Sequence, residues 1–287
     1  MKTRLLLTLL FVTLSTVTAN AVPVPDLAQL KAMTARYAPT PLRVDVSKLS
    51  PGNRKALRYL IEATSVIDDI FLEQIWSGNE RLLAALRRDH TPLGRARLHY
   101  FWINKGPWST LDDQAAFLPG VPARRPPGAS FYPVGMTAAQ FDAWVKTLPA
   151  RLQVQARGYF TVIRRVGKGG FAAVPYSDVY RAKLAKASRL LRLAANVTTD
   201  PSLARFLRAR AAAFSSNQYL ASDIDWMDVR SPLEVTIGPY ETYNDELFGY
   251  KAAFEAFVLL RDDAATRKLA ALTAHLQAVE GDLPEDP

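Results

Sequence analysis

The sequence contains no cysteine and only three histidines. The absence of thiols excludes disulfide bonds, thiolate metal ligands and a thiol nucleophile. His90, His99 and His275 do not form a His-Glu-x-x-His motif, the spacing that places two zinc ligands on one helix face. There is also no Gly-x-Ser-x-Gly, so a serine nucleophile elbow is absent. The sequence therefore predicts no catalytic residues and no metal ligands within this chain.

Long hydrophobic runs are also scarce. The only one lies near the start, where a basic beginning is followed by an apolar run over residues 5–18 and by small residues up to Ala21. This order is typical of a secretory signal peptide. The run is shorter than the roughly 20 residues that cross a bilayer as a helix, which disfavours an uncleaved anchor. We expect a signal peptide over 1–21, cleavage after Ala21, and a periplasmic or secreted chain over 22–287 without membrane attachment.

The charge balance is basic, with 36 Lys and Arg against 27 Asp and Glu. Part of the excess lies in the arginine-rich stretches Arg181–Arg192 and Arg205–Arg210. Such stretches can bind nucleic acid or an anionic surface. Here the basic residues alternate with Ala and Leu rather than with stacking aromatics, which favours solvated helix faces. We expect no nucleic-acid partner.

Helix signals occupy most of the chain. Ser50-Pro51 is an N-cap followed by proline at the first helical position, and apolar residues then recur at helical spacing until Gly78. Thr137 and Gln140 form a capping-box pattern. Other helices are predicted from Asn79 to about Asp89, from Thr137 to Leu148, from Ser177, from Asp200-Pro201, and over residues 244–260 and 263–280.

Residues 100–135 combine many aromatics with many prolines and glycines. That density of Pro and Gly prevents a continuous helix or strand. Disordered linkers are poor in aromatics, so this segment is predicted to be a long ordered loop packed by its own aromatic side chains.

Strand signals are few. Residues 158–166 and 171–176 flank Gly167-Lys168-Gly169-Gly170 and predict a hairpin. The glycine-rich turn lacks the spacing and the following helix of a phosphate-binding loop. A further strand is predicted over 233–237. The fold class is therefore α+β, predominantly α-helical with a few antiparallel strands, and these strands are too few for a sheet that closes on itself.

An acidic cluster surrounds Trp226. Asp223, Asp225 and Asp228 could provide oxygen ligands for calcium, but the glycine and terminal glutamate of an EF-hand loop are absent. Capping and turn hydrogen bonds are the favoured interpretation.

The segment from Glu234 to Lys251 carries the strongest candidate site. A predicted strand leads through Gly238-Pro239 to Glu241 and Tyr243. If the backbone stays extended there, these two side chains point to the same side. A carboxylate can pair with an amine, and a phenol can donate a hydrogen bond to a carbonyl or an oxyanion. A surface cap on the following helix is the equally weighted alternative.

The sequence resembles the dipeptidyl-peptidase III family of zinc exopeptidases, over roughly residues 55–285. The closest branch is the bacterial and plant one, whose plant members carry a fused Nudix domain. The resemblance rests on short motifs, namely Ile237-Gly-Pro-Tyr-Glu-Thr-Tyr, Leu247-Phe-Gly-Tyr-Lys-Ala-Ala-Phe-Glu-Ala-Phe-Val, Ile103-Asn-Lys-Gly-Pro-Trp-Ser, Phe117-Leu-Pro-Gly-Val-Pro, Phe131-Tyr-Pro and Trp226-Met-Asp.

The resemblance implies roles for two residues. Glu241 would hold the free amino terminus of a peptide, and Tyr243 would contact the scissile carbonyl. The family's zinc-binding His-Glu-…-His helix and its further glutamate ligand correspond to no residues here, so zinc is expected only with a C-terminal half. The family fold has two lobes, and this chain would supply part of the β-barrel lobe. An exposed apolar patch is then expected where the other half would dock.

Three functions remain open. The favoured one is an exported, truncated dipeptidyl-peptidase III-like zinc hydrolase that is inactive alone and has a separate C-terminal catalytic half as its partner. The second is a non-catalytic periplasmic module that binds peptides with a free amino terminus. The third is a helical structural protein that shares only the fold.

Overall fold

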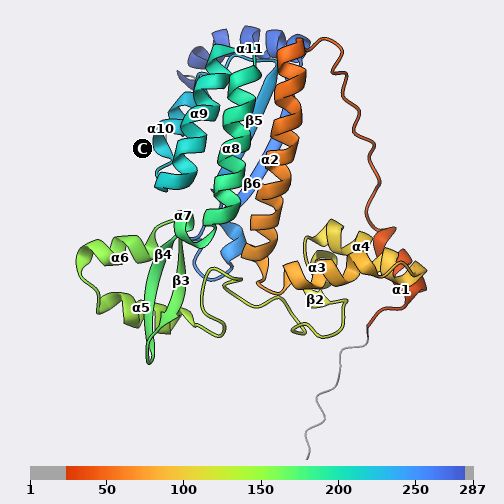
Figure 1. Cartoon of the computed structure of the whole chain (residues 1–287), viewed down its shortest axis with the longest axis vertical. Coiled ribbons are helices and arrows are strands. Elements are labelled where there is room, and N and C mark those ends of the chain that lie inside the picture. The colour runs from red at the N-terminus through yellow and green to blue at the C-terminus, as the bar shows by residue number, and fades with distance from the viewer. Residues whose placement is uncertain (1–23, 282–287) are drawn as a thin grey trace, which may run out of the picture.

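The computed structural model describes residues 24–281. Its main body is a layer of three long helices packed on a two-stranded sheet (Figure 1). The helices are α2 (Pro51–Ile75), α8 (Arg181–Val197) and α9 (Pro201–Ser216), and the sheet consists of β5 (Leu233–Glu241) and β6 (Ala253–Leu260). The short helix α10 (Leu220–Met227) lies against α9.

The first long helix begins where the sequence predicts. Ser50 Oγ accepts a hydrogen bond from the Asn53 backbone N–H at 3.1 Å, and Pro51 occupies the first turn. The Asn53 side chain is buried, donates to Asp200 Oδ2 at 2.7 Å and accepts from the Thr198 hydroxyl at 2.7 Å. This contact ties the start of α2 to the α8–α9 connection. Helix α9 begins at Pro201 as predicted, but the Asp200 side chain bonds to Asn53 and makes no cap hydrogen bond to α9.

The β5–β6 sheet is antiparallel, with Val235 opposite Val258 and Ile237 opposite Ala256. The prediction of a helix over residues 244–260 is wrong, because residues 253–260 form β6. This segment is rich in Ala and Phe, and it pairs along its whole length with the preceding strand β5. Pairing and burial in the sheet override a local helix preference.

The predicted hairpin is confirmed as β3 (Thr161–Val166) and β4 (Gly170–Pro175), with Gly167 and Gly169 at positive φ in the turn. Preceding it are α5 (Ala138–Lys146) and α6 (Ala150–Arg157), and Thr137 forms the predicted capping box. Ser177 does not begin the next long helix as predicted. It lies within the single turn α7 (Tyr176–Val179), and α8 follows Tyr180.

A second, smaller core lies beside the main one. It contains α1 (Leu27–Thr34), α3 (Asn79–Arg88) and α4 (Pro92–Asn104). Since α4 continues to Asn104, the prediction of a loop from residue 100 is wrong for its first five residues. From Lys105 onward the ordered loop is confirmed. It contains β1 (Trp108–Ser109), η1 (Thr110–Asp112) and β2 (Ala115–Ala116), and it buries the rings of Trp108, Phe117, Phe131 and Tyr132.

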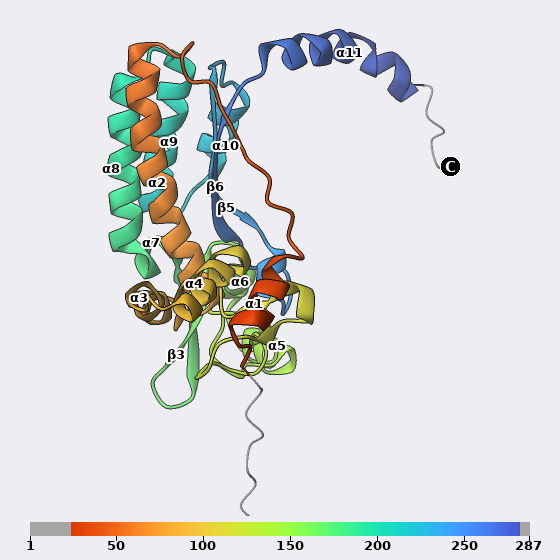
Figure 2. The same cartoon turned by 90° about the vertical axis from the view of Figure 1, so that its right-hand side faces the viewer.

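The last helix, α11 (Asp263–Gly281), projects from the body (Figure 2). Leu269, Leu272, Leu276 and Val279 on this helix are all exposed. The side of β6 that faces away from the helical layer exposes Phe257 and Leu259. The family resemblance predicts an exposed apolar patch where the other half would dock, and this expectation stays a prediction.

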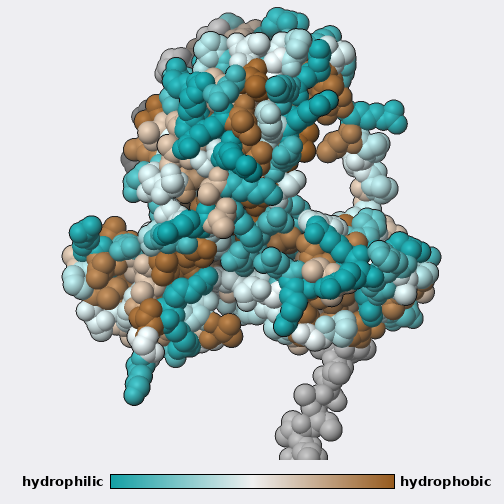
Figure 3. All heavy atoms as spheres, viewed as in Figure 1, coloured by the Kyte–Doolittle hydropathy of each residue, from teal (hydrophilic) through white to brown (hydrophobic). Residues whose placement is uncertain are grey.

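The arginine-rich stretches form mainly solvated helix faces, as predicted. Lys186, Arg189 and Arg192 on α8 are exposed, and charged and apolar side chains are interspersed on this face of the molecule (Figure 3). Arg210 is the exception, because its side chain is completely buried.

The fold class is confirmed as α+β, predominantly helical with small antiparallel sheets. Within residues 24–281 the six strands form three two-stranded sheets and no closed barrel. The predicted signal peptide falls outside the described residues. None of the helices between residues 24 and 281 combines the length and the apolar character needed to span a bilayer.

We expect Phe254→Ala to lower the free energy of unfolding by about 3–5 kcal/mol, since large-to-small changes in packed aromatic cores cost this much. Phe254 is fully buried on the inner side of β6 among the rings of Tyr176, Tyr180 and Phe214. Phe257→Ala, on the exposed side of the same strand, is the control. Urea denaturation measures both, and equal losses would show that the inner face of β6 is not part of the core.

Candidate functional site

Glu241 and Tyr243 lie where β5 enters the connection to β6. Glu241 is the last residue of β5 and is half-buried, whereas Tyr243 begins the short helix η2 (Tyr243–Asp245) and is 69% exposed. The backbone is not extended between them, because Thr242 has helical φ and ψ. Strand alternation therefore does not set their directions, contrary to the sequence-based expectation. In the part of the chain that the structure describes, neither side chain forms a hydrogen bond or an ion pair.

The connection is organised around the buried carboxylate of Asp245. Its Oδ1 accepts hydrogen bonds from the backbone N–H groups of Leu247, Phe248 and Gly249 at 2.7–3.0 Å. Its Oδ2 accepts from the N–H groups of Tyr250 and Lys251 and from the Tyr132 hydroxyl at 2.8–3.0 Å. Burial alone would raise the pKa of Asp245, but the backbone hydrogen bonds outweigh it and lower the pKa.

Lys251 anchors the far end of the same connection. Its side chain is completely buried, and Nζ donates to the carbonyl oxygens of Ala156 and Gly158 and to Thr161 Oγ1 at 2.6–2.8 Å. Burial lowers the pKa of Lys251 to about 7, while the charge of Asp245 opposes that shift. The connection is thus fixed to the end of α6 and to the start of β3.

Arg125, from the long ordered loop, contacts the middle of the connection. It donates to the carbonyl oxygen of Asn244 at 2.8 Å and forms an ion pair with Glu246 at 3.1 Å. Glu246 has a positive φ, which a non-glycine residue adopts only when its surroundings stabilise it. Together Asp245, Lys251 and Arg125 hold the backbone on which Tyr243 is displayed.

Arg210 holds the strand segment just before Glu241. Its guanidinium is surrounded by the rings of Phe206, Tyr219 and Tyr240, with centroids 5.4–5.5 Å away, and it pairs with Asp223 of α10. A Cβ at residue 238 would lie only 2.6 Å from Arg210 Nη1, so this approach requires glycine. Burial raises the pKa of Tyr240 to about 12, although the charge of Arg210 favours the phenolate.

A second carboxylate lies close to Glu241. Glu255 of β6 is opposite Gly238, and burial together with the charge of Glu241 raises the pKa of Glu255. The end of β5 therefore carries negative charge that no described cation neutralises through an ion pair. This arrangement is suited to binding an ammonium group.

The acidic cluster of α10 is not a calcium site. Asp225 and Asp228 form ion pairs with Arg205 at 2.8 and 3.1 Å, and Asp223 pairs with Arg210. The favoured alternative, capping and turn hydrogen bonds, is also wrong, since these carboxylates bind arginines of α9. The sequence predicts Arg205 only as part of a solvated basic helix face and does not predict that it pairs with these carboxylates.

The histidines lie on separate elements. His99 is on α4, His90 just precedes that helix, and His275 is on α11, at the opposite end of the molecule (Figure 1). Between residues 24 and 281 no three His, Asp or Glu side chains are grouped so that they could hold a metal ion. The described residues therefore do not provide a ligand set for the zinc ion that the family resemblance implies.

Comparison with known proteins shows which family the sequence and the fold of this chain match. Residues 169–286 match the model of peptidase family M49. The dipeptidyl-peptidase III structure from Corallococcus sp. strain EGB is 50% identical, with a TM-score of 0.87 over 92% of this chain. This chain belongs to the dipeptidyl-peptidase III family. The family member from Caldithrix abyssi is 41% identical, with a TM-score of 0.83 over 88% of this chain.

The chain spans about half the length of these family structures, covering 49% and 48% of them. It is also 38% identical over 304 residues to Nudix hydrolase 3 from Arabidopsis thaliana, covering 89% of this chain and 39% of that protein. The family membership agrees with the resemblance drawn from the sequence motifs. It does not by itself assign an activity to a chain of this length.

We expect Asp245→Asn to lower the free energy of unfolding by about 3 kcal/mol or more. In this variant an amide nitrogen replaces one carboxylate oxygen and cannot accept hydrogen bonds. Backbone N–H groups among residues 247–251 therefore lose their acceptor, at a cost of about 1–3 kcal/mol each. Hydrogen exchange of the amides of residues 247–251 should accelerate more than that of α8. Asp69→Asn, at an exposed position of α2, is the control and should stay within about 0.5 kcal/mol. Unchanged exchange in residues 247–251 would contradict the role of Asp245.

The lowered pKa of Lys251 predicts a pH dependence of stability. Its folded pKa of about 7 lies below its ordinary value of 10.5, so the unfolded chain binds the extra proton between these values. Stability relative to Lys251→Met should therefore rise with pH from about 7 to about 10, by at most about 1.4 kcal/mol per pH unit. A difference that is constant over this range would show that the three oxygen acceptors keep the ammonium charged.

Proposed function

We propose that this chain provides the part of a dipeptidyl-peptidase III-type exopeptidase that recognises the amino terminus of a peptide. Glu241 would bind the ammonium group, and Tyr243 would donate a hydrogen bond to the carbonyl of the bond to be cut. The observation that carries this proposal is the contrast within one segment. Glu241 and Tyr243 have no partners within residues 24–281, while Asp245 and Lys251 fix the backbone around them.

The electrostatics of the segment support the role of Glu241. The raised pKa of Glu255 reflects both burial and the neighbouring charge of Glu241. A peptide ammonium placed near these two carboxylates would relieve their mutual repulsion. The acyl end of an acetylated peptide carries no charge and would gain nothing there.

The exposure of Tyr243 supports its role. A phenol that forms no hydrogen bond in the described structure is free to donate to a substrate carbonyl. Donors held in place before the reaction stabilise the charge that develops on that oxygen, without the cost of reorganising at that moment. The fixed connection around Asp245 provides the required rigidity.

We further propose that the chain is exported and does not hydrolyse peptides by itself. The described residues bring together no metal-ligand group, and the sequence contains no zinc-binding His-Glu-…-His segment. The zinc ligands and the general base would come from the C-terminal catalytic half of the enzyme. The exposed apolar residues of β6 and α11 are a surface on which such a half could pack.

The second candidate is a non-catalytic module that binds peptides with a free amino terminus. This module would also use Glu241 and Tyr243. The absence of a metal-ligand set among the described residues supports it as much as it supports the incomplete enzyme. The two candidates differ in whether a catalytic half exists.

Glu241→Gln is expected to weaken the binding of a free tripeptide by about 10- to 100-fold, the usual contribution of a hydrogen bond to a charged group. Isothermal titration calorimetry with the tripeptide and its N-acetylated form measures this. The wild-type chain should prefer the free amino terminus, and Glu241→Gln should lose that preference. Glu234→Gln, on the same strand and exposed, should keep it. Equal affinity of the wild-type chain for both peptides would refute the amino-terminus site.

Hydrolysis of a dipeptidyl arylamide separates the two candidates. The isolated chain should show no turnover, and addition of a polypeptide that carries the family's zinc-binding half should restore it. Turnover by the isolated chain would contradict the incomplete-enzyme proposal. Peptide binding without restoration would favour the binding module.

A further inference from the structure

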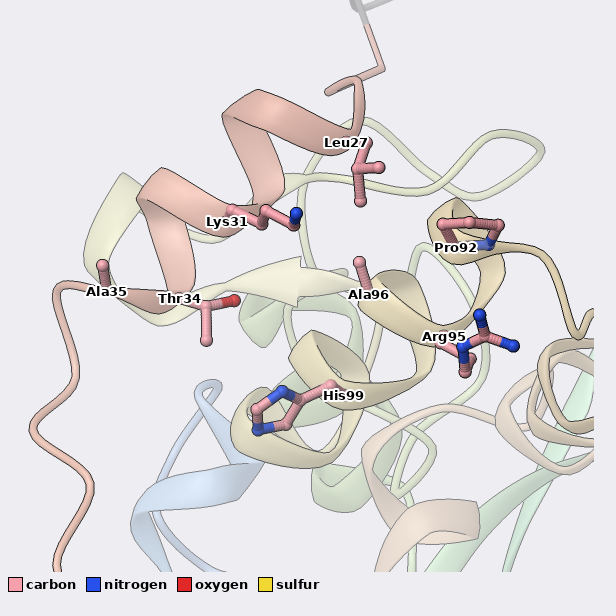
Figure 4. Close-up of a pocket in the computed structure, with 8 residues that line it drawn as sticks. All are labelled: Leu27, Lys31, Thr34, Ala35, Pro92, Arg95, Ala96 and His99. Atoms are coloured by element: carbon pink, nitrogen blue, oxygen red, sulfur yellow. The ribbon is translucent and has the colours of Figure 1, made fainter.

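The groove between α1 and α4 is lined by basic side chains (Figure 4). It has a volume of about 480 Å³ and presents Lys31 from α1 together with Arg95 and His99 from α4. Its remaining lining is Thr34 and small or apolar residues, namely Leu27, Ala35, Pro92 and Ala96. No carboxylate lines it. The α4 residues of the lining are spaced three or four apart and so share a side of that helix.

The basic groups of the groove are not neutralised by nearby acids. In the described part of the chain, neither Lys31 nor His99 makes a side-chain hydrogen bond or an ion pair. Arg95 donates only to the carbonyl oxygen of His90. The carboxylates closest in sequence are engaged elsewhere: Asp26 caps α1, Asp89 accepts from Thr91, and Asp112 pairs with Arg36.

The walls of the groove are fixed. Leu30 of α1 is completely buried in the smaller core, beside Tyr100 and Phe101 of α4. A capping box closes the start of α1, and the Arg36–Asp112 pair ties the end of that helix to the ordered loop. The basic side chains are therefore presented from a rigid frame, which reduces the entropic cost of binding a ligand.

Oxyanions match this arrangement. Lys31 and Arg95 offer several N–H donors and no acceptor, and an arginine fork fits the geometry of a phosphate group. The apolar residues beside them can contact a small organic body. A neutral ligand or a cation would leave the positive charges uncompensated.

We propose that the α1–α4 groove is a binding site for a phosphate-bearing ligand, with Lys31, Arg95 and His99 as its contacts. The site is built from other elements than the Glu241 segment and does not depend on the proposed peptidase role. The phosphate could belong to a soluble phosphate ester or to a lipid headgroup.

Isothermal titration with inorganic pyrophosphate at low salt tests the proposal. The triple variant Lys31→Gln, Arg95→Gln, His99→Gln should weaken binding by about tenfold or more, since it removes charge-assisted hydrogen bonds. The control is Lys186→Gln, Arg189→Gln, Arg192→Gln, which removes basic residues from the exposed face of α8. This control should bind as the wild-type chain does. Circular dichroism of all variants confirms that they fold.

A second arm separates the two sources of phosphate. Sedimentation with vesicles that contain phosphatidylglycerol is compared with the pyrophosphate titration. Groove-dependent binding of pyrophosphate supports a soluble ligand, and groove-dependent binding of vesicles alone supports a lipid headgroup. Equal weakening by the groove variant and the α8 control would show only a diffuse effect of net charge and would overturn the proposal. Absence of both kinds of binding would also overturn it.

Discussion

One buried carboxylate determines how this protein displays its candidate site. Asp245 collects hydrogen bonds from five backbone N–H groups and one phenol, and so it fixes residues 247–251 of the connection between β5 and β6. Each bond to an ionised acceptor is stronger than a neutral one, and the set leaves the N–H groups of a buried turn satisfied. Lys251 and Arg125 hold the same connection from its far end and its middle. Glu241 is placed by its pairing with Ala253 in the sheet, and Tyr243 begins the turn that Asp245 fixes.

Two buried cations extend this control to the neighbouring elements. Lys251 bonds to the end of α6 and the start of β3, and Arg210 reaches from α9 to Gly238 of β5. Burying charge is costly, and hydrophobic residues of similar volume often stabilise a fold as well or better. Lys251 gains three defined acceptors in return, whereas Arg210 Nε and Nη1 have no hydrogen-bond partner among the described residues. The three charged groups enclose the segment that carries the proposed amino-terminus site, while the site residues themselves remain unpaired.

The sequence predicts local features well and long-range ones poorly. The Ser50-Pro51 start, the Thr137 capping box and the Gly167–Gly170 hairpin depend on neighbouring residues, and all three are confirmed. The helix predicted over residues 244–260 is wrong because local composition does not show that residues 253–260 pair with β5 across the connection 242–252. Glu241 and Tyr243 are predicted from their chemistry after a strand and from the family motifs, whereas the roles of Asp245, Lys251 and Arg210 are not predicted. Lys251 and Arg210 act through burial and contacts with distant elements, and Asp245 acts through a local turn whose burial depends on the whole fold.

A crystal structure of the chain with a bound tripeptide would test the central claim most directly. We expect the peptide amino nitrogen within about 3 Å of a Glu241 carboxylate oxygen. We also expect the hydrogen bonds of Asp245 in their present arrangement, because the connection is already fixed before the peptide binds. A peptide bound away from Glu241, or a connection that refolds around the peptide, would contradict the claim that the buried charges hold the site ready for its ligand.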